Sequence, residues 1–212
     1  MLTLAVDTTA ELGSIALADE NRVIEEVPLS APRGFSHVLF GAMQDLLQRH
    51  SLAVEDIQLF AGASGPGSFT GVRVGLAAIK GLAETLAKPA VAVSNLEALA
   101  AFGRSLRRAV VIDAHRGEVF AALSTEVPES VLTLTAFTEL AGNLPFDWIS
   151  QDDHILALVP TGATAIKAPS AIAGTIARIA IQKLLGGDEG DPAVIEANYV
   201  RRSDAELLWK GA

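Results

Sequence analysis

The chain has 212 residues, a formal net charge of −9, and hydrophobic side chains at half of its positions. This composition allows one domain or two small ones with a sizeable core, and the absence of cysteine excludes disulfides, thiolate catalysis and cysteine-based zinc sites. The negative charge argues against nucleic-acid binding by the chain's own field. With no basic leader and no apolar run near 20 residues, we expect a soluble cytosolic protein without a membrane partner.

The first half alternates strand and helix patterns in the order βββαβαβ. Strand patterns lie at 2–9, 13–20, 22–30, 57–63 and 90–93, and helix patterns at 35–47, 68–87 and 95–102. Short turns join the first three strands, which predicts an antiparallel meander. The helix at 35–47 has one apolar stripe, and Ser36 is its expected N-cap. The sequence therefore predicts a mixed sheet with helices on its faces.

The second half repeats the opening more weakly. LAVDTTAELGSIALA and VVIDAHRGEVFAALS each place an aspartate at a strand end, a glycine shortly after it and a second strand beyond, which suggests an internal duplication. Further elements are expected as a helix at 136–142, a strand at 147–150, a buried strand at 155–161 and a helix at 170–185. We divide the chain into an N-terminal lobe, 1–103, and a smaller degenerate C-terminal lobe, 104–212, with a docked apolar tail.

A glycine-rich loop, GASGPGSFTGVRVG at 62–75, connects a strand to the helix at 68–87. Gly65-Pro66-Gly67 predicts a tight turn, and Ser68 suits the N-cap position of the helix. Free N–H groups at a helix N-terminus favour anions. An ordinary strand-to-helix turn accounts for the same residues, so both interpretations stay open.

Two duplicated lobes that each open with a hairpin resemble the superfamily of actin, sugar kinases and heat-shock ATPases (ASKHA, RNase H-like). In that superfamily the first hairpin approaches nucleotide phosphates. The resemblance implies an α/β fold and makes phosphate-loop candidates of Asp7, Thr8, Thr9, Ser14, Gly65 and Gly67.

A set of motifs in order along the chain resembles one family more closely, TsaB (YeaZ). These motifs are DTT at 7–9, the helix from FSH, GPGSFTGVRVG at 65–75, KGLAETL at 80–86, SNLEALA at 94–100, IDAHRGEVF at 112–120 and NYVRRSDAE at 198–206. The resemblance implies a cytosolic bacterial protein required for threonylcarbamoylation of the adenosine beside the anticodon in ANN-decoding tRNAs.

The resemblance also implies partners. A TsaB subunit is similar to the catalytic subunit TsaD but acts as its non-catalytic partner in a direct heterodimer, which the ATPase TsaE joins. In isolation a homodimer is expected, and tRNA is reached only through the complex. The chain alone is expected to hold no cofactor, whereas ATP or ADP is possible at the interface of the complex.

The residues favour a non-catalytic interpretation independently. TsaD holds its metal with a helical His-x-x-x-His pair, but Gly41 stands four residues after His37, and no two of the four histidines lie three to five apart. We therefore expect no metal site. Ser68 fails the G-x-S-x-G elbow pattern, so no catalytic residue is assigned. The alternative is a stand-alone nucleotide-dependent enzyme of this fold, a small kinase or ATPase, with Asp7 and Asp113 as candidate general bases by position.

The helix at 68–87 is apolar nearly all round except for a narrow stripe of Arg73, Lys80 and Glu84. Gly71 and Gly75 would let another backbone approach it. We expect this helix and the one at 35–47 to form a two-helix face for TsaD or a second copy. Its candidate residues are Phe35, Val38, Leu39, Ala42, Met43, Phe69, Val72, Arg73, Leu76, Ala77 and Lys80. Arginine at Val72 or Ala77 should separate the pair without unfolding the monomer. Alternatively, the sheet and the neighbouring helix cover everything.

Overall fold

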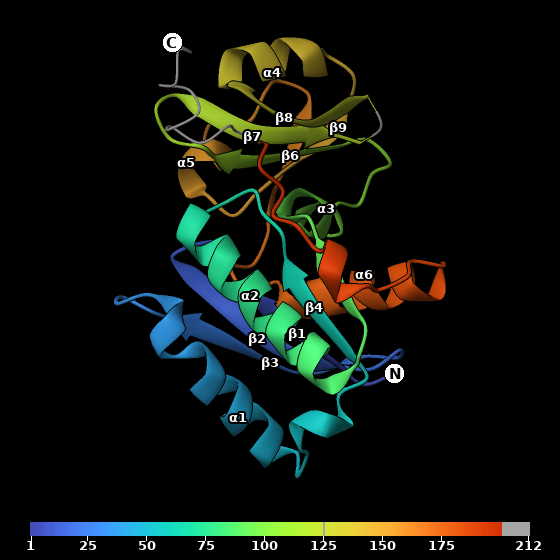
Figure 1. The fold of residues 1–212 in the computed structure, drawn as a ribbon. Helices are drawn as coiled ribbons and strands as arrows, with labels where there is room; N and C mark the ends of the chain where they lie inside the picture. The colour runs from blue at the N-terminus through green and yellow to red at the C-terminus, as the bar shows by residue number, and fades with distance from the viewer. Residues whose placement is uncertain (125, 201–212) are drawn as a thin grey trace, which may run out of the picture. The chain divides into compact units, whose positions relative to one another are not determined.

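The computed structural model describes residues 1–124 and 126–200 and shows two compact units (Figure 1). Unit 1 comprises Met1–Ala98 and Pro169–Ala197, and unit 2 comprises Leu99–Ala168 with the described residues 198–200. The sequence-based boundary at residue 103 assigned 169–197 to the second lobe. The difference arises because helix α6 (Ala173–Leu185) packs along the strands of the first sheet.

Unit 1 is built on a five-stranded mixed sheet with the order β3-β2-β1-β4-β5. Its strands are β1 (Thr3–Asp7), β2 (Leu12–Ala18), β3 (Val23–Ser30), β4 (Leu59–Ala63) and β5 (Ala90–Val93). The first three strands pair antiparallel, and β1, β4 and β5 pair parallel. The predicted meander and mixed sheet are confirmed.

Helices cover both faces of this sheet (Figure 1). Alternation along β1 explains how: Leu4 and Val6 join the core under α1 (Leu39–Arg49) and α2 (Phe69–Leu86), so the small Ala5 points to the other face, where α6 lies. Because the side chains are large on one face of the sheet and small on the other, side-chain size determines how closely each helix can approach the sheet. The remaining helical elements of this unit are η1 (Phe35–His37), η2 (Val54–Asp56), η3 (Pro192–Val194) and α3 (Asn95–Ala100), whose last two residues fall in unit 2.

The start of α1 differs from the sequence prediction. Ser36 is not an N-cap, because residues Phe35–His37 form a 3-10 turn and α1 begins at Leu39 after Val38. Phe35 is buried, and its ring lies so close to Gly13 that a Cβ there would be 2.7 Å from the ring. Packing of this ring against the β2 strand therefore fixes the turn, whatever the helical periodicity favours.

Unit 2 repeats the topology of unit 1. Its strands are β6 (Arg108–Asp113), β7 (Glu118–Leu123), β8 (Val127–Thr133), β9 (Phe146–Ser150) and β10 (Ala163–Lys167), in the order β10-β9-β6-β7-β8. Again three antiparallel strands are followed by two that pair parallel. The expected duplication is confirmed, as is the two-lobe α/β fold.

Between the strands, α4 (Leu134–Ala141) confirms the helix expected at 136–142. The buried strand expected at 155–161 is wrong: Asp153–Leu156 form α5, and only Ile155 of that run is buried. Ile155 packs into the second core beside Trp148, whose indole Nε1 donates to its carbonyl oxygen at 3.2 Å. The apolar run ILALV suggested the strand, but most of its side chains are not buried. The α4 side chain Phe137 packs near Trp148, with ring centroids 5.9 Å apart.

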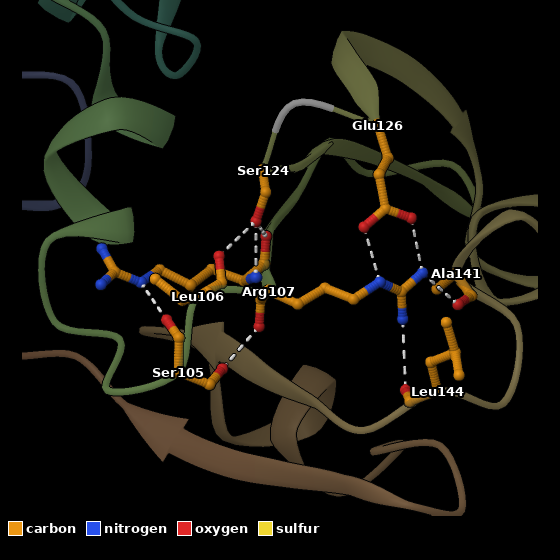
Figure 2. A network of polar contacts seen from close by, with 8 residues as sticks. Ser105, Leu106, Arg107, Ser124, Glu126, Ala141 and Leu144 are labelled. Atoms are coloured by element: carbon orange, nitrogen blue, oxygen red, sulfur yellow. Dashed lines mark hydrogen bonds and ion pairs between the residues drawn. The ribbon is translucent and has the colours of Figure 1, made fainter.

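Arg107 ties together three segments of unit 2 (Figure 2). Its guanidinium binds both carboxylate oxygens of Glu126, at 2.6 and 2.8 Å, and donates to the carbonyls of Ala141 and Leu144 at 2.7 and 3.2 Å. The carbonyl of Ala141 lies at the end of α4, where helix carbonyls lack intrahelical partners. Arg107 therefore caps α4 and joins it to the start of β8.

The tail was expected to dock through its apolar residues. Ile195 and Ala197 pack against the core of unit 1, and Lys80 of α2 donates to the carbonyl of Ala193 at 2.9 Å. Val194, in contrast, is 72% exposed. Tyr199 is 50% exposed and Val200 is half-buried. The other apolar positions expected to dock, Leu207, Leu208 and Trp209, lie outside the described residues.

Candidate functional site

The end of β1 and the glycine loop (residues 65–68) are in direct contact. The Thr9 carbonyl accepts from the Ser68 N–H at 2.6 Å, and the Thr8 hydroxyl donates to the Gly71 carbonyl at 2.7 Å. A Cβ at Gly71 would lie 1.9 Å from the Thr8 carbonyl oxygen, and one at Gly67 2.5 Å from that of Thr9. Glycine is required at both positions because the hairpin backbone occupies the space of a side chain.

A buried polar network fixes this contact from the other side. Thr9 donates its hydroxyl and its N–H to Asp7 Oδ1, at 2.6 and 3.0 Å, and its hydroxyl oxygen accepts from Asn95 Nδ2 at 2.6 Å. Burial raises the pKa of the Asp7 carboxyl above its ordinary value of 3.8, and the hydrogen bonds from Thr9 offset part of that rise. Asp7 thus serves as an acceptor that orders the strand end.

The N–H donors that could bind an anion have partners inside the chain. Gly65 donates to Asn95 Oδ1 at 3.0 Å, Ser68 donates to Thr9, and Gly71 donates to Ser68 Oγ at 3.2 Å. Ser68 is the N-cap of α2, as predicted. These contacts match the ordinary strand-to-helix turn that the sequence left open, and they direct three donors of this segment toward protein oxygens.

Ser14 has a different function from the other phosphate-loop candidates. It lies opposite Asp7 in the β1–β2 register, but its hydroxyl accepts from the N–H groups of Ile172 and Ala173, at 3.1 and 2.9 Å. Glu26 accepts from the next N–H, that of Gly174, at 2.9 Å. Ser14 and Glu26 therefore cap α6. The structure brings the other five candidates together in the hairpin–loop contact.

The candidate partner face divides into buried and exposed positions. Phe35, Leu39, Met43, Val72 and Leu76 are buried in the core of unit 1, Val38, Ala42 and Lys80 are half-buried, and Phe69, Arg73 and Ala77 are exposed. Gly71 and Gly75 face Thr8 of the same chain, so they do not serve the approach of another backbone.

The exposed ridge of α2 is the part of this prediction that remains available to a partner. Phe69 is 46% exposed, and the Arg73 guanidinium lies over its ring, 3.7 Å from the centroid. Sequence reasoning missed Phe40, which is 57% exposed on α1. The signal was its position beside the apolar stripe, since a large apolar residue off the buried stripe must face outward.

The aspartate at the end of β6 corresponds to Asp7 in the duplicated topology. Asp113 Oδ2 lies 3.2 Å from His154 Nε2 and 3.4 Å from His115 Nδ1, and both imidazoles are largely exposed. Among residues 1–124 and 126–200, no three His, Asp or Glu side chains are arranged to hold a metal ion. Across the same described ranges, no helix has the length and apolarity needed to cross a bilayer.

The chain is similar to proteins named for tRNA threonylcarbamoyladenosine biosynthesis. Residues 21–172 match the model of the family described as TsaD, tRNA N6-adenosine threonylcarbamoyltransferase. The chain is 39% identical over 125 residues to the tRNA threonylcarbamoyladenosine biosynthesis protein TsaB of Bacillus subtilis, covering 58% of this chain and 55% of the relative. For the TsaB protein of Escherichia coli, the identity is 36% over 124 residues, covering 57% and 53%.

The chain thus spans about half the length of the curated relatives it matches. The solved structure of YeaZ from Pseudomonas aeruginosa superposes with a TM-score of 0.74 at 24% identity, over 93% of this chain and 99% of that one. That likeness shows the fold. Together with the curated relatives, it confirms the resemblance to TsaB (YeaZ) proteins that the sequence motifs indicated.

Proposed function

Because the chain belongs to the TsaD family, we propose that it is a non-catalytic subunit in the biosynthesis of threonylcarbamoyladenosine in tRNA. In this proposal it binds a TsaD subunit directly, and the ATPase TsaE joins the pair. The modified adenosine lies beside the anticodon of ANN-decoding tRNAs, which the chain reaches only through the complex. Without TsaD, the same surface pairs two copies of the chain.

The observation that carries the non-catalytic part is the internally satisfied glycine loop. The N–H groups of Gly65, Ser68 and Gly71 point at oxygens of the chain itself, and the hairpin backbone fills the space above Gly67 and Gly71. A phosphate group would have to displace those contacts to use the same donors. We therefore expect ATP or ADP to be held at the interface of the complex, with no cofactor bound by this chain alone.

The absent histidine pair supports the same conclusion. His37 is the last residue of the 3-10 turn before α1 and is exposed, and Gly41 occupies the place of a second ligand. A lone imidazole is a weak site for a catalytic metal, which needs three protein ligands in most enzymes. The chemistry of transfer is accordingly assigned to the TsaD partner.

Reconstitution tests the function. Threonylcarbamoyl transfer to an ANN-decoding tRNA and ATP turnover are measured for this chain alone, for TsaD with TsaE, and for all three together. We expect transfer only in the complete mixture. Transfer by TsaD and TsaE without this chain would refute the required role. Turnover by the isolated chain would instead support the alternative, a stand-alone kinase or ATPase of this fold.

The outer ridge of α1 and α2 is the proposed partner face. It offers Phe40, Phe69 and the exposed Ala77, with Arg73 over the Phe69 ring. Aromatic side chains with an adjacent arginine are the residue types that dominate protein interfaces. Val72 belongs to the core and is 4% exposed, so the arginine test proposed from the sequence is valid at Ala77 but unsuitable at Val72.

The interface test compares two arginine variants. Ala77→Arg places a charge on the ridge, whereas Gln182→Arg places one on an exposed position of α6, on the opposite face of the sheet. We expect Ala77→Arg to remove the heterodimer peak in gel filtration with TsaD and Gln182→Arg to retain it, while both keep the circular dichroism of the parent. Retention of the complex by Ala77→Arg would place the interface elsewhere.

A further inference from the structure

Asn95 is the second residue of the SNLEALA segment, a motif that the proposed function leaves unexplained. It is the first residue of α3 and is 4% exposed. Buried asparagine side chains need hydrogen-bond partners for both amide atoms. Here both amide atoms and the backbone N–H are directed at segments far away in sequence, the end of β1 and the glycine loop.

The contacts of Asn95 hold one residue of the loop, Gly65, through both of its backbone groups. Its backbone N–H donates to the Gly65 carbonyl at 2.8 Å, and its Oδ1 accepts from the Gly65 N–H at 3.0 Å. Gly65 has a φ of 98°, a conformation that residues other than glycine rarely adopt. Asn95 thus satisfies both backbone groups at the point where the chain turns from β4 toward α2.

The side-chain amide of Asn95 also holds the residue that anchors α2. Its Nδ2 donates to the Thr9 hydroxyl at 2.6 Å, and the Thr9 carbonyl in turn accepts from the N–H of Ser68, the N-cap of α2. Asn95 therefore fixes both ends of the glycine loop, Gly65 directly and Ser68 through Thr9. The next two turns of α2 carry the exposed Phe69 and Arg73.

We propose that Asn95 is a positioning residue for the partner face. Through Gly65 and Thr9 it sets where the first two turns of α2 lie, and so where Phe69 and Arg73 meet the partner. Asn95 itself is only 4% exposed, so it acts through these contacts and not by meeting the partner directly. This inference rests on the proposed function, in which α2 binds TsaD.

The experiment measures TsaD binding by isothermal titration calorimetry for Asn95→Ala and Asn95→Asp, at a temperature where each is fully folded. Asn95→Asp keeps the acceptor for Gly65 but removes the donor to Thr9. Residues along a coupled network change binding without touching the ligand, so we expect Asn95→Ala to weaken binding about tenfold. Asn95→Asp should also weaken binding, because Thr9 loses its donor and a second carboxyl is placed near Asp7.

A second pair of variants separates positioning from general loss of stability. Thr9→Val removes the hydroxyl that links Asn95 to Asp7, and Thr9→Ser retains it. We expect Thr9→Val to weaken binding and Thr9→Ser to preserve it. Ile181→Ala is the stability control, because Ile181 is buried in α6 on the far side of the sheet. It should lower the melting temperature and leave the TsaD affinity unchanged.

The outcomes distinguish this inference from the proposed function. If the parent chain does not bind TsaD, the proposed function fails. If the parent binds and Asn95→Ala binds equally well, the positioning role is refuted while the proposed function stands. If Ile181→Ala weakens binding as much as Asn95→Ala, the effect follows overall stability and the positioning role is likewise refuted. Selective loss of amide protection at Gly65 and Ser68 in Asn95→Ala, read by hydrogen exchange, would support it.

Discussion

Replacing two glycines of α2 by alanine should change the free energy of unfolding in opposite directions. A Cβ at Gly81, on the exposed side of α2, would meet no atom within 4 Å, whereas a Cβ at Gly71 would lie 1.9 Å from the Thr8 carbonyl oxygen. Alanine is favoured over glycine inside a helix by about 1 kcal/mol, and this gain is available at both positions. Whether Gly71→Ala raises or lowers the free energy of unfolding therefore depends on the contact with Thr8.

That contact is with backbone, which no rotamer change relieves. Overpacking a tight site costs about 1–3 kcal/mol, and a 1.9 Å approach belongs at the upper end of that range. We expect Gly81→Ala to raise the free energy of unfolding by about 1 kcal/mol and Gly71→Ala to lower it by about 2 kcal/mol. Gly75→Ala should fall between them, since its obstacle is the rotatable Thr8 hydroxyl at 2.5 Å.

The assay is equilibrium unfolding in urea, followed by far-ultraviolet circular dichroism at a fixed protein concentration, with midpoints compared at a common slope. Thr8→Ala provides a check, because it removes the hydroxyl that a Cβ at Gly75 meets and leaves the carbonyl that a Cβ at Gly71 meets. It should therefore relieve Gly75→Ala and not Gly71→Ala. If Gly71→Ala and Gly81→Ala shift the midpoint in the same direction, the close approach of the hairpin to the loop is disproved.

Three further changes test two buried side chains and the Arg107 cluster of unit 2. Burial raises the pKa of Asp7, so the contribution of the protonated carboxyl to stability is full below pH 3.8 and is lost as the pH rises through the raised pKa. Asp7→Asn should therefore be more stable than the parent at pH 7. Urea titrations at pH 7 and near pH 3 test this, because the advantage should disappear at the lower pH. Phe137→Ala empties a fully buried position beside Trp148 and should lower the free energy of unfolding by about 3–5 kcal/mol, with a change in tryptophan fluorescence. Arg107→Lys keeps the charge but cannot reach Glu126 and two carbonyls together, so its melting temperature should fall nearly as far as that of Arg107→Ala; a lysine variant as stable as the parent would contradict the cap on α4.

Elements with strong local signals were predictable from the sequence. The helix at 68–87 carries its own N-cap at Ser68, and the strand at 90–93 matches β5 residue for residue. The duplicated hairpins were also visible, because the first strand of each ends in an aspartate followed by a turn. These features are determined by residues close together in the sequence, so the local sequence pattern is enough to predict them.

Features set by distant packing were not predictable in the same way. The turn at Phe35 depends on Gly13 in another strand, and β10 is a short, mostly exposed strand without alternation. The candidate partner face was predicted least accurately, because helical periodicity cannot say which apolar side of α2 the hairpin covers. Thr8 packs against Gly71 and Gly75 of α2. Val72 and Leu76 lie in the core, while Phe69 and Ala77 stay exposed.

The path of the chain through its two units has a consequence for dissecting the protein. The polypeptide leaves unit 1 after Ala98, returns at Pro169 and departs again after Ala197. A fragment cut at residue 103 would lack α6 and would expose the alanine side of its sheet. The Ser14 hydroxyl and the Glu26 carboxylate would also lose the N–H donors at the start of α6. A half-molecule that folds by itself would need residues 169–197 spliced back onto 1–98, so gene truncation alone is the wrong tool for asking what each half does.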